Sequence, residues 1–378
     1  MNKRYANHLS LIVVLFISAC ATTDTNKQPL RFIEAIEIPL DASQEGVQIG
    51  GLSSLYFDSE TNTLFSITDD KGRLGGPVIH HFDVRLTAGS LRVEPSGITK
   101  LGDTDGQPLF PEEIIDAEAF DQLGNGNWLV SSEGIDVEKY FNLPMLYEFT
   151  SEGHLVRRIN VPQKYLPKQS DAPNTGIRPN DAFEGLSISP DTKHLFLINE
   201  KALLQDGEVS KQSQSSVVRL VHKKSSTNGY DYFAEYPYVL SELPNPTAAE
   251  MVEGVLSISD ILTLNERSLL VVEKSFLTQP SIRNTVRIYR VEIPSNVTNI
   301  QDISSLNGAE FVAVYKVLWT DLDNFAVAPG FPKLDNVEGI IFGPTLANGN
   351  NTLLVITDNN FSRRQKTLIY AFEIINEP

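Results

Sequence analysis

Acidic residues recur at two places in a repeated pattern of the sequence. One set lies where a short apolar segment begins: Glu118, Glu184, Glu253 and Glu338. The other set lies where the next apolar segment ends: Asp69, Glu133, Glu200, Glu273 and Asp358. Carboxylate oxygens with flexible geometry are the ligands that calcium prefers. These acids predict a cation site if the fold brings them together, with calcium as the favoured ion.

The repeats themselves indicate the fold. Each has an apolar strand, a turn and a second strand that ends in an acid, and one or two further strand-like runs follow. The five copies span residues 50–70, 117–134, 183–200, 252–274 and 337–359. Four strands per repeat, repeated radially, are typical of a β-propeller. We predict an all-β, five-bladed propeller; residues 134–183 and 274–337 leave room for a sixth blade, and a β-sandwich is the alternative.

The two ends of the repeat region complement each other. The last copy lacks a fourth strand, whereas residues 30–40 form a strand-like run with no partner before the first copy. We expect this N-terminal strand to complete the last blade and close the ring.

Closure of the ring would gather the acids at one mouth. In an antiparallel hairpin, the start of one strand lies beside the end of the next, so both acids of a repeat share an edge. As many as nine carboxylates would then crowd together, which raises pKa values and favours bound cations. The pairs Glu253/Glu273 and Glu338/Asp358 are the leading candidates. A structural explanation stays open for each acid, because a carboxylate can also accept backbone hydrogen bonds or pair with arginine.

The N-terminus predicts export. Lys3 and Arg4 precede an apolar run over residues 9–17, which is typical of a signal peptide. Residues 17–20 then resemble the lipobox of bacterial lipoproteins and end in Cys20, the only cysteine. The resemblance implies lipidation of Cys20 and a membrane anchor, with a signal peptide over 1–19, a tether over 20–29 and the propeller over 30–378. Ala21 is not the aspartate that retains such lipoproteins in the inner membrane, so we expect an outer-membrane location, with the mouth near the membrane.

Composition excludes some functions. With 31 basic and 48 acidic residues, the formal net charge is −17, which opposes binding to nucleic-acid phosphates. The sequence contains no G-x-S-x-G nucleophile motif, no phosphate-binding glycine loop and no clustered His/Cys pattern for zinc. Metal-assisted hydrolysis remains the enzymatic hypothesis.

Several segments resemble the phytase-like family described as having esterase-like activity. They are residues 67–73 (ITDDKGR), 116–120 (DAEAF), 131–134 (SSEG), 178–191 (RPNDAFEGLSISPD), 271–276 (VVEKSF), 335–344 (DNVEGIIFGP) and 357–362 (TDNNFS). The resemblance covers residue 50 to the C-terminus and implies a propeller that hydrolyses an ester or phosphoester with the help of calcium.

The hydrolytic hypothesis assigns roles to particular residues. Glu253 or Glu338, with a raised pKa, would act as the general base, and Arg73 or Arg363 would stabilise developing negative charge. The remaining acids would hold the metal, and the substrate would be a small ester or phosphoester. The alternative is a non-enzymatic propeller that binds a ligand or a protein and contains structural calcium.

Overall fold

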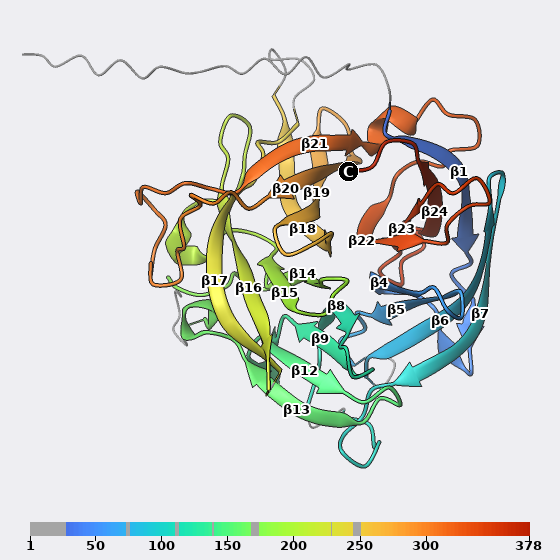
Figure 1. The fold of residues 1–378 in the computed structure, drawn as a ribbon, viewed down its shortest axis with the longest axis horizontal. Helices are drawn as coiled ribbons and strands as arrows, with labels where there is room; N and C mark the ends of the chain where they lie inside the picture. The colour runs from blue at the N-terminus through green and yellow to red at the C-terminus, as the bar shows by residue number, and fades with distance from the viewer. Residues whose placement is uncertain are drawn as a thin grey trace, which may run out of the picture.

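Five four-stranded antiparallel sheets surround a common axis, as the repeats predict (Figure 1). The computed structural model describes residues 28–72, 76–109, 113–137, 140–167, 174–227, 229–244 and 251–378. The protein is an all-β, five-bladed propeller. The segments considered for a sixth blade supply the outer strands of blades 2 and 4 instead. Cys20 and Arg73 lie outside the described residues.

Each blade runs from an innermost to an outermost strand. Blade 1 contains β4 (Leu52–Asp58), β5 (Thr63–Thr68), β6 (Val78–Thr87) and β7 (Ser90–Lys100). Blade 2 contains β8 (Ala117–Gln122), β9 (Trp128–Ser132), β12 (Met145–Phe149) and β13 (Leu155–Asn160). Blade 3 contains β14 (Phe183–Ile188), β15 (His194–Asn199), β16 (Val217–Ser226) and β17 (Gly229–Val239).

The last two blades follow the same order. Blade 4 contains β18 (Glu253–Thr263), β19 (Ser268–Gln279), β20 (Arg283–Glu292) and β21 (Tyr315–Asp321). Blade 5 contains β22 (Asn336–Gly343), β23 (Thr352–Asp358), β24 (Thr367–Ile374) and β1 (Leu30–Ile38). The remaining elements are two small hairpins and three short 3₁₀ helices: β2 (Ser43–Gln44) with β3 (Val47–Gln48), β10 (Ile135–Val137) with β11 (Tyr140–Asn142), and η1 (Gln163–Tyr165), η2 (Leu204–Asp206) and η3 (Leu322–Phe325).

The innermost strands form a ring around the axis. They contact one another in the order β4, β8, β14, β18 and β22, and β22 contacts β4. On the outside of blade 5, β1 pairs antiparallel with β24, with Leu30 opposite Ile374 and Ile38 opposite Thr367. Asp358 at the end of β23 lies at the Thr367 end of this sheet, whereas Leu30 lies at the opposite end. The chain before Leu30 therefore joins the propeller at the end of blade 5 opposite Asp358, whereas the predicted anchor at Cys20 lies outside the described residues.

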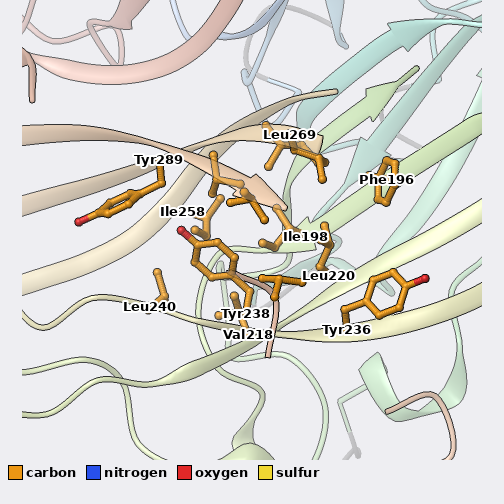
Figure 2. Packing of buried hydrophobic residues seen from close by; sticks show 14 of the residues in the cluster. Phe196, Ile198, Val218, Leu220, Tyr236, Tyr238, Leu240, Ile258, Leu269 and Tyr289 are labelled. Atoms are coloured by element: carbon orange, nitrogen blue, oxygen red, sulfur yellow. The ribbon is translucent and has the colours of Figure 1, made fainter. Parts of the chain in front are cut away.

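Apolar packing between neighbouring sheets holds the ring together. Every residue of β15 and of β23 is buried, because each blade is covered on both faces by its neighbours. Five hydrophobic clusters fill the five gaps between blades. Figure 2 shows the cluster between blades 3 and 4, where Phe196, Ile198 and Leu220 pack against Ile258 and Leu269.

Among the described residues, no helix has the length and apolar character required to cross a membrane.

Replacing Phe372 by alanine tests this packing. Phe372 is fully buried between blades 4 and 5, and its ring contacts Phe32 and Phe325. We expect Phe372→Ala to lower the free energy of unfolding by about 3–5 kcal/mol, the usual cost of such a core truncation. Urea denaturation measures the change, and Val327→Ala, at a side chain that is 92% exposed, is the control. Equal midpoints for the two variants would contradict this description of the core.

Candidate functional site

A β-bulge in the innermost hairpin of every blade directs side chains toward the axis. The pairing register shifts between Ser53 and Tyr56, Ala117 and Phe120, Phe183 and Gly185, Ile258 and Asp260, and Val337 and Gly339. A bulge leaves an extra residue outside the ladder and changes the direction of its side chain. The bulges of blades 2, 3 and 5 contain Glu118, Glu184 and Glu338, three of the four acids predicted for the first strands.

Acids that end or follow the second strands lie beside these glutamates. Asp69, Asp116 and Glu118 have carboxylate oxygens within 4.8 Å of one another, and so do Glu133, Glu184 and Glu200. Asp358 is close enough to Glu338 for its charge to raise the Asp358 pKa. We call nine residues the acidic cluster: Asp69, Asp116, Glu118, Glu133, Asp181, Glu184, Glu200, Glu338 and Asp358. Seven of them were predicted from the repeats, whereas Asp116 and Asp181 were not.

Burial and mutual repulsion shift the pKa values of the cluster upward. Burial raises the pKa values of Glu118 and Glu184 well above the ordinary range, and neighbouring carboxylates add to both shifts. Burial, followed by the charge of Glu200, raises the pKa of Glu133 to about 8. Burial, followed by the charge of Glu338, raises the pKa of Asp358 to about 7. In the absence of a cation, part of the cluster is therefore protonated at neutral pH.

Three lysines offset some of this charge, and the repeat analysis missed them. Lys71 Nζ lies 3.0 Å from Asp116 Oδ2, and Lys274 Nζ lies 2.7 Å from both carboxylate oxygens of Glu338. Lys201 pairs with Asp181 and lies 3.3 Å from Glu200. Burial opposes the charge of Lys71, but the carboxylates of Asp69 and Asp116 outweigh burial and raise the ammonium pKa. Each lysine comes one or two residues after a second-strand acid, which is a signal that the sequence contains.

The prediction for blade 4 was wrong. Glu253 is exposed, hydrogen bonds with Gln279 at 3.3 Å and lies outside the acidic cluster. The bulge places Ser259 at the position of Glu184 and Glu338, because β18 and β19 continue beyond the level of the cluster.

Glu273 also lies outside the acidic cluster. It faces blade 3, where it accepts a hydrogen bond from Tyr238, and it also accepts one from Lys316 on β21 of its own blade. Lys274 takes the position that Glu200 has in blade 3, because both residues directly follow the residue opposite the start of the bulge.

Of the two predicted arginines, the structure describes only Arg363, whose side chain lies away from the acidic cluster. Arg363 is exposed and lines a shallow surface groove with Leu40, Asp41, Ser43 and Gln48. In the described part of the chain, no hydrogen bond or ion pair joins its guanidinium to the acidic cluster. Arg73 lies outside the described residues.

Some cluster carboxylates also join neighbouring blades. Glu133 Oε1 accepts a hydrogen bond from the backbone N–H of Ala182 in the segment that leads into blade 3. Asp358 Oδ1 accepts one from the backbone N–H of Leu52 in blade 1, at 2.9 Å. Two buried oxygens, Asp116 Oδ1 and Glu133 Oε2, have no hydrogen-bond partner among the described residues. Buried polar oxygens normally have a partner, so a bound ligand would explain both.

A pH titration tests the electrostatic description at Asp260, outside the acidic cluster. Asp260 is 2% exposed, and its carboxylate accepts the backbone N–H of Ile340 at 2.8 Å. Burial raises its pKa well above the ordinary value. Above about pH 4, the carboxyl group is ionised in the unfolded chain but stays protonated in the folded protein, so folding takes up a proton. The free energy of unfolding therefore falls as the pH rises from about 4 toward the pKa of the folded state.

We expect Asp260→Asn to flatten the fall in unfolding free energy between pH 5 and pH 8, by up to about 1.4 kcal/mol per pH unit. Urea unfolding across this range measures the slope. The same substitution at the exposed Asp105 should leave the slope unchanged. Parallel curves for the wild type and Asp260→Asn would show that the buried carboxyl does not take up a proton on folding.

An uncharacterized secreted protein of Arthroderma benhamiae is 25% identical over 276 residues, which are 61% of this chain and 53% of that protein. The chain thus spans about half the length of this relative. A candidate glycoside hydrolase from Parabacteroides distasonis has 10% identity and a TM-score of 0.44, covering 94% of this chain and 96% of its own. A luciferin-regenerating enzyme has 12% identity and a TM-score of 0.37, and the alignment covers 90% of this chain and 97% of that enzyme's chain.

The sequence model of the phytase-like family, described as "Esterase-like activity of phytase", matches residues 47–361, and the match contains all five blades' innermost strands and the whole acidic cluster. The chain belongs to this phytase-like family of propellers.

Proposed function

We propose that the acidic cluster binds calcium and that the protein is a calcium-assisted hydrolase of an ester or a phosphoester. The observation that carries the proposal is the convergence of two groups of three carboxylates, each with oxygens within 4.8 Å of one another. Family membership supports hydrolysis as the reaction class. Such a concentration of buried acids is destabilising unless cations offset it.

The residues present fit calcium. Calcium takes six to eight oxygen ligands, and a carboxylate can supply one or two of them. Asp116 Oδ1 and Glu133 Oε2 are buried oxygens, one in each group, that lack a hydrogen-bond partner among the described residues. The first group would be Asp69, Asp116 and Glu118, and the second would be Glu133, Glu184 and Glu200. Glu338 lies close enough to Glu184, and Asp358 close enough to Asp69, for their charges to interact.

The chain's own groups can perform hydrolysis. A bound cation would polarise the carbonyl or phosphoryl oxygen of the substrate. Glu338, whose carboxylate pairs with the Lys274 ammonium, takes a proton from water, whose oxygen bonds to carbon or phosphorus as the ester bond breaks. A carboxyl group outside the two calcium-binding groups, such as that of Asp358, whose pKa is raised to about 7 by burial and by the charge of Glu338, gives a proton to the leaving alcohol. The ammonium group of Lys71, which is 26% exposed, can hold a substrate oxygen.

Export and lipidation form the second part of the proposal. The signal-like N-terminus, the lipobox resemblance ending in Cys20 and the secreted relative support an exported protein. Lipidation of Cys20 would anchor the protein to a membrane. Because Leu30 enters blade 5 at the end opposite Asp358, the acidic cluster would then face away from the anchor.

A purely structural cation site in a ligand-binding propeller is the second candidate. The hydrogen bonds from Ala182 to Glu133 and from Leu52 to Asp358 favour it, since they use cluster carboxylates to join neighbouring blades. This candidate predicts calcium binding without turnover.

Calcium should stabilise the purified protein. Saturating calcium in place of a chelator should raise the melting temperature by about 5 °C, as expected when a ligand binds only the folded state. Glu118→Gln and Glu184→Gln should reduce the shift. Glu253→Gln is the matched control and should keep it, because Glu253 lies outside the cluster. A wild-type melting temperature that does not respond to calcium would contradict the proposed metal site.

Turnover separates the two candidates. We expect calcium-dependent release of 4-nitrophenol from 4-nitrophenyl acetate or 4-nitrophenyl phosphate. Glu184→Gln, which removes a proposed calcium ligand, and Glu338→Gln, which removes the proposed general base, should each lower kcat/KM by roughly 100-fold or more. Glu253→Gln should leave kcat/KM unchanged. A calcium-dependent melting shift without any release would favour the structural candidate.

A further inference from the structure

Blade 4 differs from the other blades in the length of its inner hairpin. β18 has 11 residues and β19 has 12, whereas β14 and β15 have six each. β15 ends at Asn199, next to Glu200 of the acidic cluster, but β19 continues for five residues past Lys274, to Gln279. At about 3.3 Å per residue, the hairpin extends roughly 17 Å beyond the level of the cluster.

One face of this extension is apolar and exposed. Val255 and Phe276 are directly opposite each other in the β18–β19 pair, and they are 45% and 46% exposed. Exposed aromatic and branched side chains paired across two strands form a ready apolar contact surface.

The apolar pair lies on the same face as a cluster contact. Residues two apart on a strand project to the same side, and Phe276 is two residues after Lys274, which pairs with Glu338. Val272, which is two residues before Lys274 and so on the same face, packs against blade 5. Val271 and Leu277, on the other face, pack against blade 3. The face with Phe276 and Val255 is therefore a continuation of the blade 5 side of the hairpin. β22 and β23 end at Asn336 and Asp358, near the level of the cluster, so they leave this face uncovered.

We propose that Val255 and Phe276 bind an apolar substituent of the substrate, an alkyl or aryl group, while its ester or phosphate group lies at the acidic cluster. This inference rests on the proposed function and adds the substrate class: amphiphilic esters rather than small, fully polar ones. The surface is continuous with the cluster through Lys274, so one ligand can contact both. A bilayer is a poorer occupant, because the chain before Leu30 joins the propeller at the opposite end.

Binding affinities for two homologous ligand series test the inference. Isothermal titration calorimetry with methyl and octyl phosphate at saturating calcium examines the site in its proposed state. Methylammonium and octylammonium without calcium examine the apolar pair independently of the hydrolase proposal, because the carboxylates attract a cationic head group in any case. In both the phosphate and the ammonium series, we expect the wild type to bind the octyl compound at least roughly tenfold more tightly than the methyl compound, because burial of methylene groups is favourable.

The double variant Val255→Ser/Phe276→Ser should bring the octyl-to-methyl ratio of affinities near one. Phe276→Leu should retain most of it. Phe233→Ser is the matched control, because Phe233 is also 46% exposed but lies on β17 of blade 3, and it should leave the ratio unchanged.

The outcomes separate the two proposals. A chain-length preference in the ammonium series that the double variant loses, combined with no detectable binding of either phosphate, would support the apolar pair and count against the calcium–phosphate site. Phosphate binding without a chain-length preference would overturn the apolar pair and leave the calcium site intact. Equal affinities within both series, or a chain-length preference that the double variant keeps, would also overturn the apolar pair. Equal affinities combined with binding of the wild type to phosphatidylcholine vesicles would overturn it in favour of a membrane surface.

Discussion

The crowding of nine buried or half-buried carboxyl groups around one axis is the constraint on which the rest of this structure depends. Each carboxylate removed from water raises the free energy of the folded state unless a proton, a cation or a hydrogen bond offsets its charge. Three lysines supply part of this compensation, and backbone N–H groups of Ala182 and Leu52 supply another part. Burial nevertheless raises the pKa values of Glu118, Glu184 and Glu133 above their ordinary range, which protonation or a bound cation would offset.

The propeller supports this arrangement through the separation of its two kinds of interaction. Five apolar clusters lie between the blades and provide the favourable burial that holds the sheets in place. The bulges lie on the innermost strands, where the ladder is interrupted and a side chain can leave the plane of the sheet. Charged groups thus gather at the axis without entering the cores. The same carboxylates also join neighbouring blades, so a structural role and a metal-binding role are compatible in one residue.

Blade 4 breaks the symmetry of the ring. Ser259 and Lys274 occupy positions that are acidic in blade 3, so this side of the cluster is less negative. The inner hairpin of the same blade extends past the cluster and presents Val255 and Phe276. A ring with one chemically distinct side can orient a ligand, because charge and apolar surface then meet along one direction only.

The fold class and most of the acidic cluster could be predicted from the repeat pattern alone. Five repeats predicted five blades, and hairpin geometry predicted that Glu118 and Glu133, or Glu184 and Glu200, would share an edge. These inferences depend only on the alternation of apolar and polar residues along each strand and on the antiparallel pairing of consecutive strands. Both can be recognised in a single sequence. The register of blade 4 could not be predicted in this way. There the Glu-Gly pattern at Glu253 matches the other repeats, but the residue left unpaired on β18 is Ser259, six residues later, whereas the register shift at Glu253 leaves Thr278 of β19 unpaired. The repeat pattern does not distinguish these two positions; the pairing with β19 and the packing against blades 3 and 5 place Ser259 at the level of the cluster. The same packing decided that Glu273 faces Tyr238 whereas Lys274 faces Glu338, because adjacent residues on a strand point in opposite directions and only the neighbouring blades fix which direction is the axis.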